Sequence, residues 1–580
     1  MKRTLAIIIC TFFHFSIAAQ QSYLRGEVKD ESGRPLQNVM ILHPSGYIFY
    51  SGSAGTFGIL SSATKDSLIF SLEGYQKQKV LAEATAYNKV VLKKAVKAVV
   101  LNKLSSFTKD LKFETQQQWF VGDETYASKV ENNFISAEKY PSTDVTLNVD
   151  RASYSNVRRF LNSKSMVPPD AVRVEEMLNY FNFNYREPKD GKTFEIETKL
   201  TTCPWNETNQ LLFAVVRSKK VLLDSLPPTH LVFLIDASAS MDAPTRMPLI
   251  KAGFRGLVNN LRAKDSVSIV IYGATVGVYL NTTSGAEKQK IINAIDSLET
   301  GGSTPGESGV KLAYSVARNH FIPNGNNRVI LATDGDFNVG LRNEEDLEEM
   351  ITLQRQSGVY LTCLGVGMGN YKDSKIQTLA QKGNGNFAYI DCYAEAEKVM
   401  MKEFMQTLYT VADDASLNVS FDPGYVKSYR VIGFDNKVGA IKNTAATIEG
   451  GEVGSGYSML VAFEIEPVKM PTVAPVHPAT LSLHYKLPKQ VKLLTERFDA
   501  SLALTPFTRL DSSYQFAAAV ILFGSLLHES RFIKDKNWND VLSIASKSYN
   551  AADASQKEFP ALVEKAKAIY GTKKKKKFSY

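Results

Sequence analysis

Between residues 230 and 400, short apolar runs alternate with amphipathic stretches, and this alternation constrains the fold more than any other feature of the chain. The apolar runs are 231–235, 267–272, 329–332 and 360–366, and the helical patterns are 247–263, 286–298, 309–320 and 344–356. The first and third runs are almost wholly apolar, as expected for strands that are covered on both faces. The pattern predicts a doubly wound α/β sheet, whose ligands bind at the carboxyl ends of the strands.

Polar side chains follow these runs at the edge where a ligand is expected. Asp236, Ser238 and Ser240 follow the first run as D-x-S-x-S, Asp334 follows the third run, and a glycine-rich loop between two helical patterns carries Thr304. An oxygen-only ligand set with two carboxylates suits Mg²⁺ or Mn²⁺ and leaves a coordination position open. A carboxylate from a partner protein would supply the missing negative charge. Taken alone, D-x-S-x-S is also compatible with a helix cap or an Asx turn.

The three motif parts together resemble the metal-ion-dependent adhesion site of von Willebrand factor A (VWA) domains, which have a Rossmann-like core. The resemblance covers residues 228–411. It implies that Ser238, Ser240 and Thr304 contact the metal, and that Asp236 and Asp334 act directly or through water. It also implies a protein-binding module rather than an enzyme. The neighbouring residue 242, an aspartate, has no role in the motif and is expected to face solvent.

The flanking segments resemble a narrower bacterial group of secreted VWA proteins. Residues 142–161, 168–177 and 203–206 match the opening of that group, and a helical tail at 511–570 matches its uncharacterised C-terminal domain. We therefore predict a VWA-associated N-terminal domain over 134–226 and a β-rich plus helical C-terminal domain over 412–572, joined to the VWA domain through a helix at 394–411. Asn148 stands where relatives are expected to carry an acid, which argues against a second metal site at Asn148 and Asp150. A strand-edge structural role is predicted for both residues instead.

The N-terminal region contains short alternating segments separated by turn signals, which predicts a small β-sandwich over residues 22–95. The expected strands are 23–28, 39–42, 58–60, 67–72 and 89–92. The runs G-E-V-K-D-E-S-G-R-P-L-Q-N-V, S-A-G-T-F-G and F-S-L-E-G-Y resemble the carboxypeptidase regulatory-like module, which has a transthyretin-like fold and no catalytic residues. The resemblance implies a structural or docking module. Residues 96–133 are polar and are expected to form a linker.

The first residues of the chain suggest export. Lys2 and Arg3 precede an apolar stretch and then Ala18 and Ala19, which predicts a signal peptide over 1–19 and a location in the periplasm, at the cell surface or outside the cell.

Most of the net charge of +9 comes from Lys2, Arg3 and a basic tail at 573–580, so no nucleic-acid partner is expected. The run Lys573–Lys577 leaves weak contact with anionic surfaces open. An apolar run at 516–527 is too short for a transmembrane span.

These observations favour an exported protein that binds an unidentified partner through a divalent cation, with the partner supplying Asp or Glu. One alternative is an envelope scaffold or assembly factor that uses the N-terminal β module. Another is a metal-dependent hydrolase, because a bound ion can activate water. No general base is encoded beside the three loops, and we therefore expect no enzymatic activity and no catalytic residue.

Overall fold

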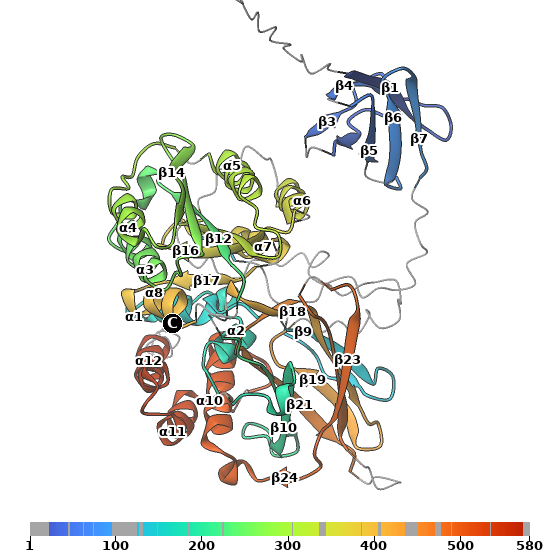
Figure 1. Cartoon of the computed structure of the whole chain (residues 1–580). Helices are drawn as coiled ribbons and strands as arrows, with labels where there is room; N and C mark the ends of the chain where they lie inside the picture. The colour runs from blue at the N-terminus through green and yellow to red at the C-terminus, as the bar shows by residue number, and fades with distance from the viewer. Residues whose placement is uncertain are drawn as a thin grey trace, which may run out of the picture. The chain divides into compact units, whose positions relative to one another are not determined.

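The computed structural model divides into two compact units, Met1–Lys103 and Leu104–Tyr580, and each is described by itself (Figure 1). The described residues are 22–44, 47–61, 63–72, 75–94, 124–126, 131–147, 149–183, 186–222, 226–303, 305–335, 344–355, 357–383, 385–403, 406, 408–434, 451–469, 477–488, 490–533 and 535–571. The predicted signal peptide, the basic tail and most of the predicted linker lie outside these residues, as do Asn148 and Thr304.

The N-terminal unit is a sandwich of two sheets, ordered β4-β1-β7 and β3-β2-β5-β6. Its strands are β1 (Ser22–Asp30), β2 (Met40–Leu42), β3 (Ile48–Tyr50), β4 (Thr56–Ser61), β5 (Lys65–Ser71), β6 (Gln78–Glu83) and β7 (Tyr87–Leu92). Leu24 and Ile59 from one sheet and Phe70 from the other meet in an apolar core. The sequence pattern did not predict β3 and β6, because most of their residues are exposed and their apolar alternation is weak.

The predicted doubly wound sheet is confirmed, with strand order β14-β13-β12-β15-β16-β17. Its strands are β12 (Thr229–Asp236), β13 (Ser266–Tyr272), β14 (Gly277–Ser284), β15 (Asn326–Thr333), β16 (Tyr360–Val366) and β17 (Phe387–Ile390). Its helices are α3 (Met247–Asn259), α4 (Lys288–Asp296), α5 (Gly306–Asn319), α6 (Glu344–Arg355), α7 (Asp373–Lys382) and α8 (Tyr393–Glu397). Leu231 and Phe233 of β12 pack with α3 and α4, whereas Val232 and Leu234 pack with α5, α6 and α7.

The sequence pattern missed β14, α7 and β17, and it extended one helix too far. Strand β14 is antiparallel to β13, and only one of its eight residues is buried, so it shows no long apolar run. The helix predicted over 394–411 is wrong beyond its first turns. Helix α8 ends at Glu397, a π-helical turn covers Lys398–Lys402, and β18 (Thr410–Phe421) follows. Val411 belongs to the core of a β-sandwich, and strand pairing there overrides the local helical pattern.

The segments before and after the doubly wound sheet fold together, which differs from the predicted division into 134–226 and 412–572. One sheet is ordered β24-β10-β11-β21-β19-β8, and the other contains β20-β18-β22-β23 with β9 paired to β18. The remaining strands are β8 (Ile135–Ser136), β9 (Ser142–Thr146), β10 (Phe194–Thr202), β11 (Gln210–Ser218), β19 (Val426–Val431), β20 (Gly451–Gly454), β21 (Ser458–Pro467), β22 (Ala479–Lys486), β23 (Leu493–Asp499) and β24 (Leu504–Thr505). Each of these sheets therefore contains strands from before and from after the doubly wound sheet.

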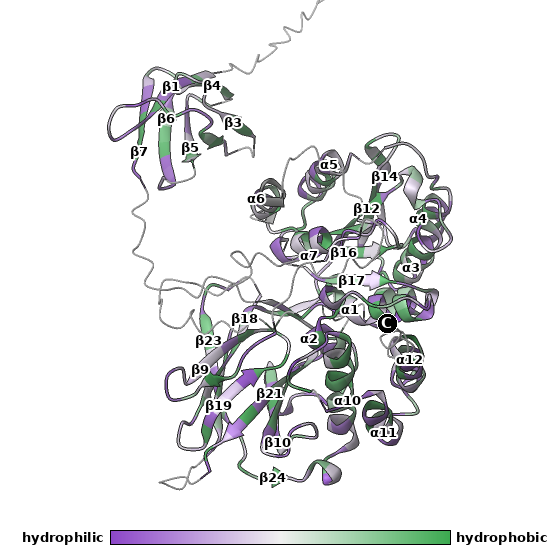
Figure 2. Cartoon of the chain, turned by 180° about the vertical axis from the view of Figure 1, so that it is seen from behind, coloured by the Kyte–Doolittle hydropathy of each residue, from purple (hydrophilic) through white to green (hydrophobic). Residues whose placement is uncertain are grey.

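A helical layer covers the outer face of the β11-containing sheet. It is made of α1 (Ala152–Asn162), α2 (Val174–Asn179), α10 (Ser512–Leu527), α11 (Trp538–Ser548) and α12 (Ala554–Gly571). Leu211 and Phe213 face this layer, while Leu212 faces the sandwich core. Figure 2 shows α10 as strongly apolar, and the run predicted to be a buried helix is buried here. Over the described part of the chain, no helix is long and apolar enough to cross a membrane.

Buried arginines join the helical layer to the doubly wound sheet. Arg158 of α1 lies with its Nη2 2.5 Å from Asp391 Oδ1, just after β17. Arg173, before α2, lies with its Nη1 2.6 Å from Asp373 Oδ2 at the start of α7, and both side chains are fully buried. Both arginines stand in the stretches that resemble the secreted VWA group. These stretches therefore hold arginines that form contacts with the doubly wound sheet.

Replacing Arg173 with methionine should destabilise the protein by about 3–5 kcal/mol, because it removes the cation that neutralises a fully buried carboxylate. The measurement is the free energy of unfolding in urea. Lys427→Met removes a lysine from the exposed ion pair with Glu466 and should cost less than about 1 kcal/mol. Equal effects of the two changes would contradict a structural role for the Arg173 ion pair.

Candidate functional site

The D-x-S-x-S motif forms a tight turn at the carboxyl end of β12. Asp236 is the last residue of the strand and is fully buried. Its Oδ1 accepts hydrogen bonds from the backbone nitrogen and the Oγ of Ser238, at 3.0 and 2.5 Å. The Oγ atoms of Ser238 and Ser240 lie 3.1 Å apart. Because the Ser238 hydroxyl directs its proton to the carboxylate, lone pairs of its oxygen remain to face a cation.

Strand β15, which runs parallel to β12, brings the second carboxylate to the same edge. Asp334 follows β15 and is fully buried. The preceding Thr333 donates from its Oγ1 to Asp236 Oδ2 at 3.0 Å, and Tyr272, at the end of β13, donates to the same oxygen at 3.2 Å. Three neighbouring strands therefore end around Asp236.

The glycine-rich loop lies against the motif turn. Gly301 donates its backbone N–H to the carbonyl of Ala237 at 2.7 Å, and Ala239 donates to the carbonyl of Gly302 at 3.3 Å. Gly302 has a φ of +78°, and a Cβ there would lie 2.2 Å from Ala274 Cα, so a larger residue cannot take its place. This loop leads directly to Thr304, which is outside the described residues.

The electrostatics of this edge suit a cation. Burial raises the pKa of Asp236 to about 6, the hydrogen bonds from Ser238 oppose that rise, and the negative charge of Asp334 adds to it. The described oxygen donors are two carboxylates and two serine hydroxyls, which fit a hard divalent ion such as Mg²⁺ or Mn²⁺. No group of three or more His, Cys, Asp or Glu residues suited to a metal occurs in the described ranges.

Arg246 also reaches this edge, and no sequence pattern predicted it. Its Nη1 lies 2.7 Å from Asp334 Oδ2 and 2.5 Å from the carbonyl oxygen of Ser240. Its Nη2 lies 2.8 Å from Asn370 Oδ1, in the loop after β16. A single arginine in a loop has no spacing that distinguishes it from a surface residue. Asp242 is exposed, as expected for a residue without a role in the motif.

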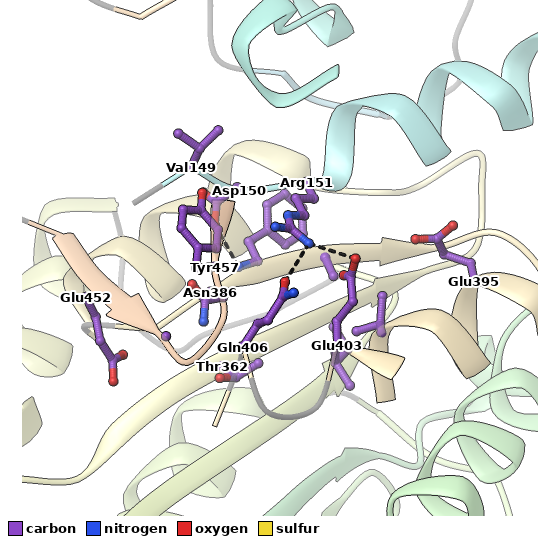
Figure 3. A pocket seen from close by; sticks show the side chains of 15 residues that line it. Val149, Asp150, Arg151, Thr362, Asn386, Glu395, Glu403, Gln406, Glu452 and Tyr457 are labelled. Carbon is purple, nitrogen blue, oxygen red and sulfur yellow. Dashed lines mark hydrogen bonds and ion pairs between the residues drawn. The ribbon is translucent and has the colours of Figure 1, made fainter. Parts of the chain in front are cut away.

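A pocket with several polar side chains lies beside the first residues of β17 and the middle of β16 (Figure 3). Arg151 Nη1 contacts Glu403 Oε1 at 2.7 Å and Gln406 Oε1 at 3.1 Å. Asp150 Oδ1 accepts the backbone N–H of Phe387, the first residue of β17, at 2.8 Å. The contact attaches the segment before α1 to the edge of the sheet, which supports the structural role predicted for Asp150.

The stability of the protein should fall as the pH rises through the range where Asp150 ionises. Burial raises the pKa of Asp150 to about 8, and the negative charge of Glu176 adds to the rise. The stabilisation is therefore complete below the unfolded pKa of about 4 and is lost as the pH rises toward 8. Asp150→Asn keeps the acceptor oxygen without the charge. It should stabilise the protein by about 1–3 kcal/mol at pH 8 relative to its effect at pH 5, as measured by urea unfolding. A variant whose effect is the same at both values would contradict this assignment.

Comparisons with known proteins agree with this architecture. Residues 230–402 match the von Willebrand factor type A domain, residues 121–213 match a model described as von Willebrand factor, and residues 406–569 match the C-terminal region of the uncharacterized protein YfbK. YfbK of Escherichia coli (strain K12) is 34% identical over 475 residues, which cover 77% of this chain and 82% of that relative. The inter-alpha-trypsin inhibitor heavy chain H2 of Sus scrofa is 25% identical over 148 residues, 24% of this chain and 16% of that protein.

Solved structures show more distant likeness. The ArnB paralog VWA2 from Sulfolobus acidocaldarius has a TM-score of 0.36 and 17% identity, and the match covers 65% of this chain and 98% of that one. A von Willebrand factor type A protein from Catenulispora acidiphila has a TM-score of 0.38 and 14% identity, with coverage of 63% and 88%. The functional argument therefore depends on the site itself.

Proposed function

The chain belongs to the YfbK family of von Willebrand factor type A proteins, and on that premise we propose that it is an exported protein that binds a partner through a divalent cation. The cation is Mg²⁺ or Mn²⁺, and the partner protein supplies an exposed Asp or Glu. The residues that hold the cation are Asp236, Ser238, Ser240, Thr304 and Asp334.

The observation that carries the proposal is the burial of two carboxylates at one sheet edge. Asp236 and Asp334 are both fully buried, at the ends of adjacent strands. Burying two like charges at one sheet edge is costly unless positive charge offsets them, and the single charge of Arg246 beside Asp334 offsets only one of the two. The hydroxyls of Ser238 and Ser240 add neutral oxygen ligands beside the carboxylates.

The ligand set favours binding over catalysis. Two carboxylates and a few hydroxyls do not enclose a six-coordinate ion, and an outside carboxylate both fills the remaining position and balances charge. When bound, the cation supplies a fixed positive charge for that carboxylate. The described groups that donate to Asp236 are from Ser238, Tyr272 and Thr333. In this proposal both carboxylates are ligands of the cation, and the groups beside them are hydroxyls and a backbone amide, which are poor general bases at neutral pH; this supports a binding module.

Asp236→Ala should abolish cation binding without unfolding the protein. Isothermal titration of MnCl₂ into the mature chain should give saturable binding for the wild type. The affinity of the variant for Mn²⁺ should fall by more than about 100-fold. Changing a residue that only orients a metal ligand costs at most about 100-fold, and loss of a ligand itself should cost more. Asp242→Ala, which removes an exposed acid from the same loop, is the matched control and should bind normally. Wild-type affinity in Asp236→Ala would refute the site.

The export part of the proposal rests on the charged, apolar and small-residue order of residues 1–19. Expression of the full chain in a bacterial host should yield a secreted or periplasmic protein whose N-terminal sequence begins near Gln20. A chain recovered from the cytosol with Met1 intact would contradict export and would leave the cation site untouched.

A further inference from the structure

Arg246 places a permanent positive charge inside the proposed cation site. Its Nη1 contacts both Asp334 Oδ2 and the carbonyl oxygen of Ser240, at 2.7 and 2.5 Å. Only 12% of the Arg246 side chain is exposed. The guanidinium group stays protonated at any pH at which proteins are folded, so its charge is a fixed property of the site.

The loop after β16 is shaped to hold this side chain. Arg246 Nη2 lies 3.0 Å from the carbonyl oxygen of Met368 and 2.8 Å from Asn370 Oδ1. Gly367 has a φ of +86°, and a Cβ there would approach Arg246 Nε to 2.4 Å, so the glycine makes room for the guanidinium. The backbone nitrogen of Gly369 donates to Glu124 Oε1 at 2.6 Å, which anchors the loop from outside the sheet. Arg246 is therefore seated by several groups and does not behave as a loose surface residue.

The arginine changes the charge that a cation and a partner meet. Asp236 and Asp334 together carry two negative charges when ionised, and Arg246 reduces their sum to one. A divalent ion on this set leaves one net positive charge, whereas without the arginine the charges would cancel. Repulsion between the guanidinium and the ion weakens binding of the ion alone. The same surplus charge attracts the carboxylate of a partner.

We propose that Arg246 makes cation binding and partner binding depend on each other. It lowers the affinity of the site for the cation alone and raises the affinity of the loaded site for a carboxylate. The cation and an acidic partner therefore bind as a pair, and the free protein holds its cation weakly. This inference rests on the proposed function of the same site, and it adds the residue that couples the two ligands.

The test titrates MnCl₂ into the mature chain, with and without acetate as the carboxylate probe. Acetate should increase the Mn²⁺ affinity of the wild type by about tenfold, a typical coupling between two ligands. Arg246→Met should bind Mn²⁺ alone about 10–100-fold more tightly than the wild type, as expected when one unit charge near the ion is removed. In this variant acetate should give little further gain. Arg255→Met, which removes an exposed arginine from α3, is the matched control and should behave as the wild type does.

The outcomes separate the inference from the proposed function. Equal Mn²⁺ affinities in wild type and Arg246→Met, with equal gains from acetate, would overturn the coupling role and leave the cation site intact. No binding by any of the proteins, with or without acetate, would overturn both. If Arg246→Met does not fold by circular dichroism, Arg246→Gln retains a hydrogen-bonding side chain without the charge and takes its place, with the same expected gain in affinity.

Discussion

The structure depends on one electrostatic constraint, which is that two carboxylates end buried strands at the same edge of a covered sheet. β12 has no exposed residue, and Asp236 is its final side chain. Asp334 follows the adjacent β15 and is equally buried. The groups that contact the two carboxylates include hydrogen-bond donors and a positive charge, from Ser238, Thr333, Tyr272 and Arg246. A cation bound at this edge would neutralise the negative charge of the two carboxylates that the protein's own groups leave uncompensated.

That constraint explains why the sheet needs rigid surroundings. A pair of buried charges is tolerated only if its neighbours stay in position. The loop after β16 supports Arg246 through Met368 and Asn370, and Glu124 supports the loop. Glu124 is itself held by Arg159 of α1, at 2.7 Å. A chain of contacts therefore connects the proposed cation site to the helical layer. Segments outside the VWA domain thus help to hold the loops of the site in position.

The region that flanks the doubly wound sheet depends on pairing between strands that are far apart in the chain. Strand β11 pairs with β21, and its two faces pack against different layers. A sheet made only from the segment before the doubly wound sheet, or only from the segment after it, would therefore lack part of its core. The buried ion pairs of Arg158 and Arg173 then attach this composite body to the doubly wound sheet. Buried pairs of this kind add little net stability but penalise any other arrangement of the parts. Buried ion pairs as well as apolar packing therefore join these two parts of the fold.

The sequence by itself determined the local features. Apolar runs of the right length predicted four strands of the doubly wound sheet, and the order of motif parts predicted that Asp236, Ser238, Ser240 and Asp334 would come together at its carboxyl edge. The apolar stretch at 516–527 predicted a buried helix. These predictions depend on side chains a few residues apart and on the rule that parallel strands end at one edge.

Only the tertiary structure decided the rest, because it depends on contacts between residues far apart in the chain. Strand pairing turned residues around Val411 from a predicted helix into β18 and merged two predicted domains into one body. The role proposed for Arg246 also depends on the tertiary structure, because it comes from the contact with Asp334, which is far away in the sequence. Periodicity records which face of an element is apolar, but it carries no information about which distant strand or charge will meet that face.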